Sequence, residues 1–406
     1  MFDVVIVGAG ASGLLTAIVA ARRGKKVLIL EKNNKIGKKL LATGNGKCNI
    51  ANQRPTLERF YSQNPQFLKD ILQDYGFQSV KQFFKSIGLE LIEAKEGKVF
   101  PMSLQASAVV ELLVAECEYL GVKIMCETAV KKIVFDNNIF SIEYDSHNIK
   151  TKKVVIATGH CSAPQLGGVM DGIGFARAFG HKIVKDFPTL VQLTSAYKEN
   201  YLSQMAGVKV DARVTLRSKS QTFIKQGDVL FTNYGISGLA ILDISRRVME
   251  ALKNSSELTL EIDLMPKMSY EQLRAMMKKS LIKKSQKPLT IWMQGFINKK
   301  LINPILEPLK LDNETVSSLL SSIEKVDMIV KKIKHFEFKV NGSKGYKGAE
   351  VATGGVDTQE VDAKTMESKK QKGLYFVGEV LDIDGDRGGF NLHLAWVCGL
   401  RAGESL

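Results

Sequence analysis

The sequence predicts an α/β fold in which a doubly wound parallel sheet is interrupted by an insertion that is first β-rich and then helical. A buried β-run, a glycine-rich turn and a helix follow one another at the start of the chain. A strand and a closing helix return near its end, and the pattern in between changes at about residue 190. The length of 406 residues exceeds what one core usually organises, so we expect two or three domains.

The first part of the chain alternates strands and helices, as parallel sheets require. Apolar spacing predicts strands at 2–7 and 26–30 with a helix at 12–23 between them. The same reasoning predicts helices and strands further on, namely helices at 65–86, 103–120 and 171–179, and strands at 123–135, 139–144 and 152–157.

Beyond residue 190 short β-runs suggest an antiparallel unit with one helix among its strands. The expected strands are 208–216, 222–224, 229–231 and 258–263, with the helix at 237–252. Three further helices are predicted at 268–285, 289–302 and 313–322, before a strand at 373–377 and a helix at 390–403. We therefore expect four segments: the first part of a nucleotide-binding domain (1–190), a β-rich insertion (191–265), a basic helical insertion (266–334) and the second part of the nucleotide-binding domain (335–406).

Composition narrows the class of protein. Hydrophobic residues make up 45% of the chain and charged residues 24%, as in ordinary globular proteins. The chain starts on a buried strand without a cationic leader, and no apolar run approaches the roughly 20 residues that span a bilayer. We expect a cytoplasmic protein with no membrane partner.

The cysteines point to neither a metal site nor a redox-active dithiol. Metal ligands cluster at characteristic spacings, and this chain has no C-x-x-C pair. We therefore predict no metal site. The five cysteines are Cys48, Cys117, Cys126, Cys161 and Cys398.

The clearest motif is Gly8-Ala9-Gly10-Ala11-Ser12-Gly13, a G-x-G-x-x-G between a predicted strand and a predicted helix. The glycines allow a tight turn and let backbone amides approach a pyrophosphate at the positive end of the helix. The second strand ends at Glu31, where a carboxylate can accept hydrogen bonds from ribose hydroxyls. This spacing predicts a Rossmann-type dinucleotide site, for either NAD or FAD.

Four later segments favour FAD, because in them the chain resembles the BaiN/YhiN-like flavoprotein family. Gly37–Leu41 with Thr43–Asn49 is similar to that family's G-R-K-L-L…G-G-G-R-C-N signature. Val154–Gly159, Gly227–Gly238 and Gly373–Asn391 match further family segments, and the likeness runs from end to end. The resemblance implies a doubly wound Rossmann-type FAD-binding domain with an inserted β-rich plus helical substrate domain.

The fingerprint and the resemblance together give the expected FAD-binding residues. Val130 is expected to hold adenine, and the Gly388–Asn391 turn to present a helix N-terminus to the flavin, where it stabilises the negative charge of the reduced ring. His393 departs from the family pattern, in which Gln is usual. The full set is Gly8, Gly10, Ala11, Ser12, Gly13, Glu31, Lys32, Lys39, Leu40, Thr43, Gly44, Asn45, Cys48, Asn49, Val130, Ala157, Thr158, Gly159, Gly378, Glu379, Asp386, Gly389, Phe390 and Asn391.

The resemblance also implies a reaction. Family members look like synthases of dihydrouridine in large-subunit ribosomal RNA, in which a hydride from reduced flavin and a proton from an acid saturate a C=C bond. Cys48 is the candidate acid, with simple packing under the flavin as an equal alternative. No second dinucleotide fingerprint is present, so NAD(P)H is expected to bind transiently, if it is the reductant.

Two other functions stay open at this point. One is small-molecule redox chemistry, such as amine oxidation or steroid ene-reduction. The other is a non-enzymatic role as a flavin-stabilised factor that binds RNA.

The net charge of +15 favours a polyanionic partner. Ten Lys and Arg against two Glu give the segment 266–310 a charge of +8, over half of the excess. We therefore expect RNA contact there, although solvated helix faces often look the same. The candidate RNA-binding residues are Lys278, Lys279, Lys283, Lys284 and Lys287.

Overall fold

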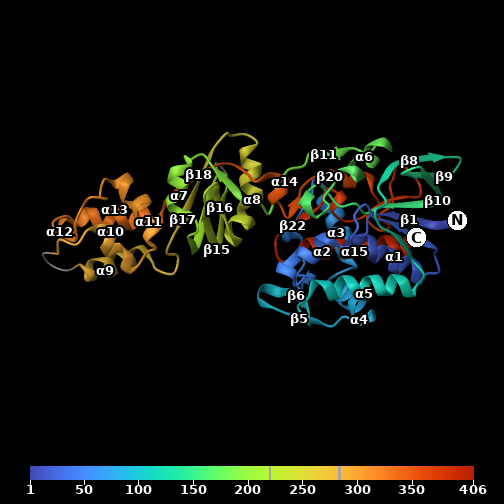
Figure 1. The fold of residues 1–406 in the computed structure, drawn as a ribbon, viewed down its shortest axis with the longest axis horizontal. Coiled ribbons are helices and arrows are strands. Elements are labelled where there is room, and N and C mark those ends of the chain that lie inside the picture. Colours follow the sequence, from blue (N-terminus) through green and yellow to red (C-terminus); the bar gives the residue numbers. More distant parts are fainter. Residues whose placement is uncertain (219–220, 282–284) are drawn as a thin grey trace. The chain divides into compact units, whose positions relative to one another are not determined.

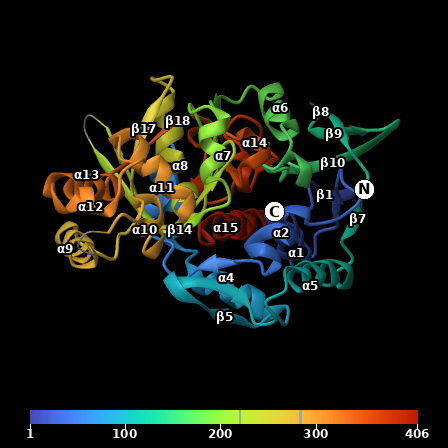
Figure 2. The same ribbon diagram turned by 60° about the vertical axis from the view of Figure 1, so that its left-hand side comes forward.

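The computed structural model describes residues 1–218, 221–281 and 285–406. Its internal contacts divide the chain into two compact units. Met1–Phe187 and Glu350–Leu406 form the first unit, and Pro188–Ala349 form the second. Figure 1 and, after a turn of 60°, Figure 2 show the path of the chain within each unit. Among the described residues, no helix is long and apolar enough to cross a membrane.

The first unit is built around a seven-stranded sheet, and this confirms the predicted α/β class. Strands β7, β2, β1, β10 and β21 are parallel, and β9 and β8 extend the sheet in antiparallel fashion. The strands are β1 (Phe2–Val7), β2 (Val27–Leu30), β7 (Lys123–Met125), β8 (Val130–Asp136), β9 (Ile139–Tyr144), β10 (His147–Ile156) and β21 (Leu374–Phe376).

The register of this sheet determines where the site forms. Val7 lies opposite Leu30 on one side and Ile156 on the other, and Ile156 lies opposite Phe376. The carboxyl ends of four parallel strands therefore meet at one edge. In open α/β sheets ligands bind beyond this edge.

Two helices from opposite ends of the sequence pack closely in the first unit: α1 (Ala11–Arg22) and α15 (Phe390–Ser405). Glycines at 399 and 403 permit the contact. A Cβ added at Gly399 would lie 2.9 Å from the Cβ of Leu15, and one at Gly403 would lie 2.5 Å from the Cβ of Val19. The first and last parts of the Rossmann domain are thus joined through a helix pair that needs small residues.

We expect Gly403→Ala to lower the free energy of unfolding by about 1–3 kcal/mol, because the added methyl group forces the two helices apart. The helix propensity of Ala, roughly 0.5–1 kcal/mol better than that of Gly, offsets only part of this cost. Gly174→Ala is the matched control, since Gly174 lies in a helix and its Cβ would meet nothing within 4 Å. Urea denaturation should show the first variant weakened and the second unchanged or strengthened. Equal stability of the two variants would contradict the close packing.

Smaller elements complete the first unit. Strands β3, β5 and β6 form a three-stranded sheet, and β4 pairs with β22 and β11 with β20. The remaining elements are α2 (Lys38–Ala42), β3 (Ala51–Asn52), β4 (Phe60–Tyr61), α3 (Pro65–Gln73), α4 (Phe77–Ser86), β5 (Leu91–Glu93), β6 (Lys98–Pro101), α5 (Ala106–Tyr119), α6 (Asp171–Ala178), β11 (Ile183–Val184), β19 (Val351–Ala352), β20 (Gly355–Val356) and β22 (Asp384–Gly385).

The second unit contains a closed six-stranded barrel in the order β13-β16-β15-β14-β17-β18. The predicted strands 222–224 and 229–231 are one continuous strand, β15, which pairs with β14 from Thr222 to Leu230. The barrel strands are β13 (Leu193–Ser195), β14 (Lys209–Arg217), β15 (Thr222–Thr232), β16 (Gly235–Ser237), β17 (Leu258–Asp263) and β18 (Phe336–Ser343). The short strand β12 (Pro188–Thr189) precedes the barrel, and the helix α8 (Leu239–Leu252) lies between β16 and β17 in the sequence.

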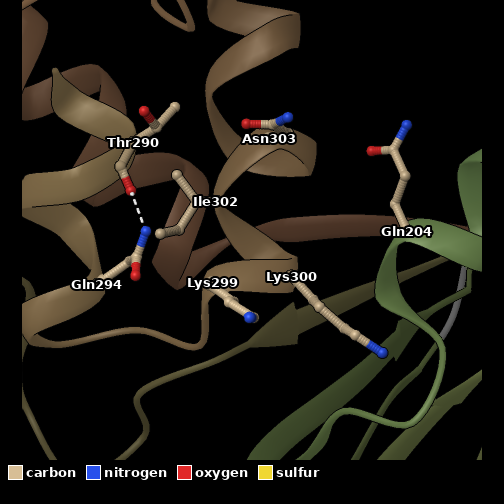
Figure 3. A pocket seen from close by; sticks show the side chains of 7 residues that line it. All are labelled: Gln204, Thr290, Gln294, Lys299, Lys300, Ile302 and Asn303. Atoms are coloured by element: carbon tan, nitrogen blue, oxygen red, sulfur yellow. Dashed lines mark hydrogen bonds between the residues drawn. The ribbon is translucent and has the colours of Figure 1, made fainter.

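The helical part of this unit shares one hydrophobic core with the barrel. The helix expected at 289–302 is broken into two, because the Asn298 side chain caps a new helix by accepting from the Lys300 N–H at 3.0 Å. The helices are α7 (Glu199–Met205), α9 (Tyr270–Ser280), α10 (Leu289–Trp292), α11 (Lys299–Leu306), α12 (Val316–Leu320), α13 (Ile323–Lys334) and α14 (Gly345–Gly348). A polar pocket opens between α7, α10 and α11 (Figure 3).

The unit boundary differs from the expected one at residue 335. Residues 335–349 belong to the second unit because β18 pairs with both β17 and β13 and so closes the barrel. The β-rich and helical segments, expected as separate parts, lie together in this unit.

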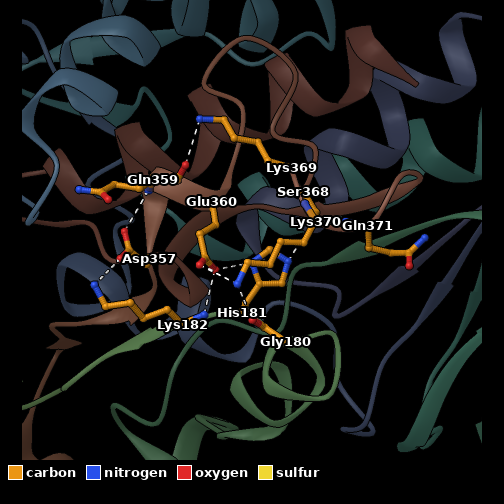
Figure 4. A network of polar contacts seen from close by, with 10 residues as sticks. All are labelled: Gly180, His181, Lys182, Asp357, Gln359, Glu360, Ser368, Lys369, Lys370 and Gln371. Carbon is orange, nitrogen blue, oxygen red and sulfur yellow. Dashed lines mark hydrogen bonds and ion pairs between the residues drawn. The ribbon is translucent and has the colours of Figure 1, made fainter.

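A polar network around the buried ring of His181 ties two distant stretches of the first unit together (Figure 4). Glu360 accepts from the backbone N–H of Lys182 at 2.8 Å and pairs with Lys370 at 2.7 Å. The ring of His181 lies between Glu360, 3.2 Å from its Nδ1, and the Ser368 hydroxyl, 2.8 Å from its Nε2. These contacts hold the loop that precedes β21 against the start of β11, so that β21 can add to the central sheet.

Candidate functional site

The glycine-rich turn between β1 and α1 makes backbone contacts that leave no room for side chains at Gly8 and Gly13. Gly8 has a φ of 108°, and a Cβ there would lie 2.5 Å from the carbonyl oxygen of Ala157. A Cβ at Gly13 would collide with the carbonyl oxygen of Gly8. A Cβ at Gly10, in contrast, would meet nothing within 4 Å, and no side chain caps the helix that follows. The first turn of α1 thus has amides without a capping side chain and open space beside Gly10, which suits a bound anion.

Glu31 directly follows β2 at the same edge of the sheet. Its Oε2 accepts from the Ala9 N–H at 2.8 Å, and its Oε1 accepts from the Asn33 N–H and Nδ2 at 2.8 and 2.7 Å. A carboxylate offers about four acceptor positions, so ribose hydroxyls can still bind. The contacts hold the carboxylate in place before any nucleotide arrives.

Two other expected residues flank Glu31. The Thr128 N–H donates to the carbonyl oxygen of Glu31 at 2.8 Å, which places Val130, at the start of β8, near this end of the sheet. Lys32 is exposed and pairs with Asp171 at 3.1 Å, so its ammonium group already has an acidic partner.

The stretch Ala157–Gly159 leaves β10 beside the glycine turn. The Ala157 N–H donates to the carbonyl oxygen of Val7 at 2.9 Å. A Cβ at Gly159 would lie 3.7 Å from Oε2 of Glu379. On the other side, a Cβ at Gly378 would lie 2.6 Å from the hydroxyl oxygen of Ser12. The two FAD-related segments expected from residues 157–159 and 378–379 therefore meet at the start of α1.

Lys39, Ser162 and Glu379 form a hydrogen-bonded group at this meeting point. Lys39 Nζ lies 2.7 Å from both Glu379 Oε2 and Ser162 Oγ, and Ser162 also donates to Glu379 Oε1 at 2.7 Å. Burial by itself raises the pKa of Glu379, but the charge and hydrogen bonds of Lys39 and Ser162, with the Ala352 N–H, hold that pKa below its usual value. Glu379 is thus a neutralised anion. Ser162 was not among the expected site residues, because no motif spacing marks it.

The loop that carries the Thr43–Asn49 motif has an unusual backbone. Gly44, Asn45, Gly46 and Cys48 all have positive φ angles. The Cys48 N–H donates to the carbonyl oxygen of Thr43 at 3.0 Å and closes the loop. The Thr43 hydroxyl donates to the carbonyl oxygen of Leu40, whose own side chain is buried in the core.

This loop is fastened to the first turn of α15. In the amide orientation that satisfies both of its ends, Asn49 accepts from the Gly389 N–H at 3.1 Å. Asn52 donates to the carbonyl oxygen of Gly388 at 3.1 Å, and a Cβ at Gly389 would collide with the carbonyl oxygen of Ala51. Glycine at 389, with a φ of 96°, is what allows the helix to begin this close to the loop.

Three expected cofactor residues shape the turn before α15. Asn391 bonds to the N–H and the carbonyl oxygen of Gly385, both at 2.8 Å. Asp386 accepts from Arg59 at 2.7 Å, and the Arg59 guanidinium lies 4.4 Å from the centre of the Phe390 ring. No side chain caps α15, so its first amides are available to an anionic group.

Cys48 is fully buried, and burial raises the pKa of its thiol to about 11 against the smaller, opposing effect of a hydrogen bond to Thr43. The thiol therefore stays protonated at neutral pH. Its burial favours packing over proton donation, while the catalytic role remains a prediction.

Three side chains that the sequence did not connect come together beyond Gly159. His160 Nδ1 lies 3.1 Å from Cys161 Sγ, and the latter lies 3.9 Å from Asp186 Oδ2. The Cys161 N–H donates to the same His160 nitrogen at 2.9 Å, so the lone pair of His160 Nδ1 already accepts a hydrogen bond within the protein. Hydrogen bonding within the protein accounts for the proximity of these three side chains. The absence of a metal site remains a prediction.

His393 lies in α15 and is fully buried, and burial lowers its pKa to about 4 despite a smaller opposing effect of the Tyr75 backbone. Neither ring nitrogen makes a clear hydrogen bond within the described residues. A depressed histidine pKa means that the unfolded chain binds the proton more tightly. The contribution of the buried neutral imidazole to the free energy of unfolding is therefore fully present above about pH 6.5 and is lost as the pH falls toward 4.

We expect His393→Gln to remove this dependence. The wild-type protein should lose about 2 kcal/mol more than the variant between pH 7.5 and pH 5. Urea midpoints at the two pH values measure the difference, and His147→Gln, on an exposed strand end, serves as control. Parallel pH profiles for wild type and His393→Gln would contradict a buried neutral imidazole.

In the second unit the basic residues differ in their pairing. Lys267 pairs with Asp211 at 3.3 Å, and Arg274 NH2 lies 2.9 Å from Asp327 Oδ2. Lys279 makes no ion pair within the described residues. Of the other expected RNA-binding residues, Lys278 lies in the last turn of α9 and Lys287 is exposed just before α10. Lys283 and Lys284 lie outside the described residues.

Comparison with known proteins places this site in a family. A family model described as the HI0933-like protein Rossmann domain matches residues 2–405. A 3-dehydro-bile acid delta(4,6)-reductase of Clostridium scindens is 34% identical over 403 residues, which cover 98% of each chain. A ribosomal RNA dihydrouridine synthase of Haemophilus influenzae is 34% identical over 396 residues, 97% of this chain and 95% of that one.

Among solved structures, a 3-ketosteroid-delta4-(5alpha)-dehydrogenase from Rhodococcus jostii shares the fold. Its TM-score is 0.50 at 16% identity, with 100% of this chain and 96% of that one covered. The match of the family model along almost the whole chain, on a sheet edge built for a dinucleotide, leads to one conclusion: this chain belongs to the HI0933-like family and is an FAD-dependent oxidoreductase.

Proposed function

We propose that this oxidoreductase reduces the C=C bond of a uridine in large-subunit ribosomal RNA to dihydrouridine, with electrons from NAD(P)H. The observation that carries the proposal is a basic helical segment whose Lys279, Lys287 and Lys299 have no acidic partner among the described residues. Such cations suit RNA phosphates. Relatives named ribosomal RNA dihydrouridine synthase, at 34% and 31% identity, support the same substrate. A ribosomal substrate also agrees with the expected cytoplasmic location.

The residues at the sheet edge fit FAD. We propose that the amides of α1 bind its pyrophosphate, that Glu31 binds the ribose and that the start of α15 faces the flavin. The open space at Gly10 and the two uncapped helix starts support this assignment. Glu379, neutralised by Lys39, is proposed to accept hydrogen bonds from ribityl hydroxyls without repelling the diphosphate.

Bound FAD, once reduced, supplies a hydride for one carbon of the alkene. The protein has to protonate the neighbouring carbon, and we propose Cys48 as the first residue to test. A thiol held protonated by burial is in the required state, although its high pKa makes it a weak donor. Cys48→Ala tests it by single-turnover oxidation of the reduced enzyme with RNA. A donor role requires a large loss of rate with unchanged FAD content.

A transient site is proposed for NAD(P)H. The second G-x-G, at Gly172 and Gly174, opens α6, and a Cβ at Gly172 would collide with the Thr158 hydroxyl. That glycine therefore serves close packing, and no second dinucleotide turn is seen in the described residues.

The decisive experiment is mass spectrometry of ribosomal RNA nucleosides from a strain that lacks the gene. We expect loss of one dihydrouridine and its return when the wild-type gene is restored. Purified protein with NADPH should form dihydrouridine in a large-subunit RNA transcript. Unchanged dihydrouridine in the deletion strain would reject the ribosomal substrate.

A second candidate has its own support. The relative named as a bile acid reductase is 34% identical over 98% of both chains, which makes ene-reduction of a steroid-like small molecule the alternative. Oxidation of the reduced enzyme by an enone, but not by RNA, would favour it. Amine oxidation has less support than ene-reduction, because the relatives described are named as a bile acid reductase and as dihydrouridine synthases.

A further inference from the structure

The pocket between α7, α10 and α11 has a volume of ≈ 330 Å³ and a polar lining (Figure 3). Gln204 reaches it from α7, while Lys299 and Lys300 stand at the start of α11. The lining residues are Gln204, Thr290, Gln294, Lys299, Lys300, Ile302 and Asn303. Two are cations, three are amides and none is acidic.

The contacts of these side chains separate fixed groups from available ones. Lys300 Nζ donates to the carbonyl oxygen of Ala206 at 2.6 Å, and Gln294 Nε2 donates to the Thr290 carbonyl oxygen at 3.2 Å. The first contact joins α11 to the end of α7, and the second lies within the single stretch from Thr290 to Gln294. Lys299, Gln204 and Asn303 make no hydrogen bond or ion pair to other described residues, and all three are exposed. One positive charge and two amides therefore face the pocket without protein partners.

We propose that this pocket holds one unpaired nucleotide of the RNA substrate, an inference that rests on the proposed function. Lys299 pairs with the phosphate, and the amides of Gln204 and Asn303 hydrogen-bond the edge of the base. Its volume is at the lower end of the range for ligand pockets, roughly 300–1,000 Å³, as a single nucleotide requires. Sequence-specific RNA recognition mostly targets unpaired bases, whose edges are free for such hydrogen bonds.

The charge of the basic helical segment that contributes to the pocket favours a polyanion over a small anion. Lys279 and Lys287 belong to the same helical segment and, like Lys299, have no acidic partner among the described residues. A chain of phosphates can satisfy several such cations at once, whereas a small anion can satisfy one. No aromatic side chain lines the pocket, so hydrogen bonds and charge, rather than stacking, have to hold the nucleotide.

The test compares variants of the full-length, FAD-loaded protein in binding of a fluorescent single-stranded RNA oligonucleotide across a range of KCl concentrations. Lys299→Gln should weaken binding about five- to tenfold and reduce the slope of log K against log salt by about 0.7, the value for one phosphate contact on a single strand. Asn303→Ala should weaken binding severalfold and leave the slope unchanged, because an amide carries no charge. Lys331→Gln, which removes an exposed lysine of α13 that pairs with no acidic residue in the described parts of the chain, is the matched control and should stay within twofold.

Flavin absorbance and melting temperature are expected to be the same in all three variants. Equal effects of Lys299→Gln and Lys331→Gln would overturn the pocket assignment, even if the wild-type protein makes dihydrouridine. Tighter binding of polyglutamate than of RNA, lost in Lys299→Gln, would overturn it in favour of an acidic protein partner. Should the variants behave as expected while the deletion strain keeps all its dihydrouridine, the pocket stands and the proposed reaction falls.

Discussion

Gly10→Asp is expected to abolish FAD binding without unfolding the protein. Gly10 precedes α1 in an extended conformation (φ −85°, ψ −168°) that any residue can adopt, and its Cβ would meet nothing within 4 Å. Asp is a favourable residue at such a helix start, where it caps free amides. The same carboxylate would occupy the place proposed for the diphosphate and repel it.

The expected loss of FAD affinity in Gly10→Asp is large. A like charge about 4 Å away at an effective dielectric constant of about 20 costs on the order of 4 kcal/mol, or about a thousandfold in affinity. Gly10→Ala is the control, since it adds a methyl group without charge and should lose less than tenfold. Flavin absorbance after reconstitution and the melting temperature of the apoprotein measure the two properties separately. A yellow Gly10→Asp protein with one FAD per chain would show that the diphosphate lies elsewhere.

Lys39→Met is expected to weaken FAD binding by about 30- to 100-fold. The substitution leaves Glu379 with Ser162 and a backbone amide but with no cation, next to the glycine turn. Loss of one partner of a largely buried ion pair costs about 2–3 kcal/mol when water reaches part of it. Lys39 and Glu379 side chains are 32% and 21% exposed, which places them in this range.

The pH dependence distinguishes this electrostatic role from simple packing. Without Lys39 the pKa of Glu379 rises, because burial and the nearby diphosphate both disfavour its charged form. FAD binding by Lys39→Met should therefore improve as the pH falls and Glu379 becomes neutral, whereas wild-type binding should not. Glu379→Gln in the same chain should restore much of the affinity at neutral pH. Lys38→Met, the neighbouring lysine of α2, controls for general charge loss, and a flat pH profile for Lys39→Met would contradict the neutralising role.

Local motifs were read correctly where a few neighbouring residues decide the structure. The glycine turn at residues 8–13 and the opening of α15 both need positive φ angles or close backbone contacts that only glycine accepts. Such constraints are visible in the sequence, because they act within a few residues. The long helix expected at 289–302 was wrong, since the Asn298 cap and the core of the second unit interrupt a stretch whose apolar spacing alone suits one helix. Helix α13 was missed for a related reason: its buried face alternates with a run of lysines.

The sequence by itself determined the class of the fold and the family, and it predicted the place of the dinucleotide site, because these depend on glycine geometry and on the order of buried strands. Only the tertiary structure decided that Lys39 and Glu379, 340 residues apart, pair directly and that Ser162 bonds to both. It also decided which lysines of the basic segment have acidic partners. Charge pairing across such distances in sequence depends on where strand ends and helix faces meet. That meeting is set by the register of the sheet and by the packing of α1 on α15, which no local pattern encodes.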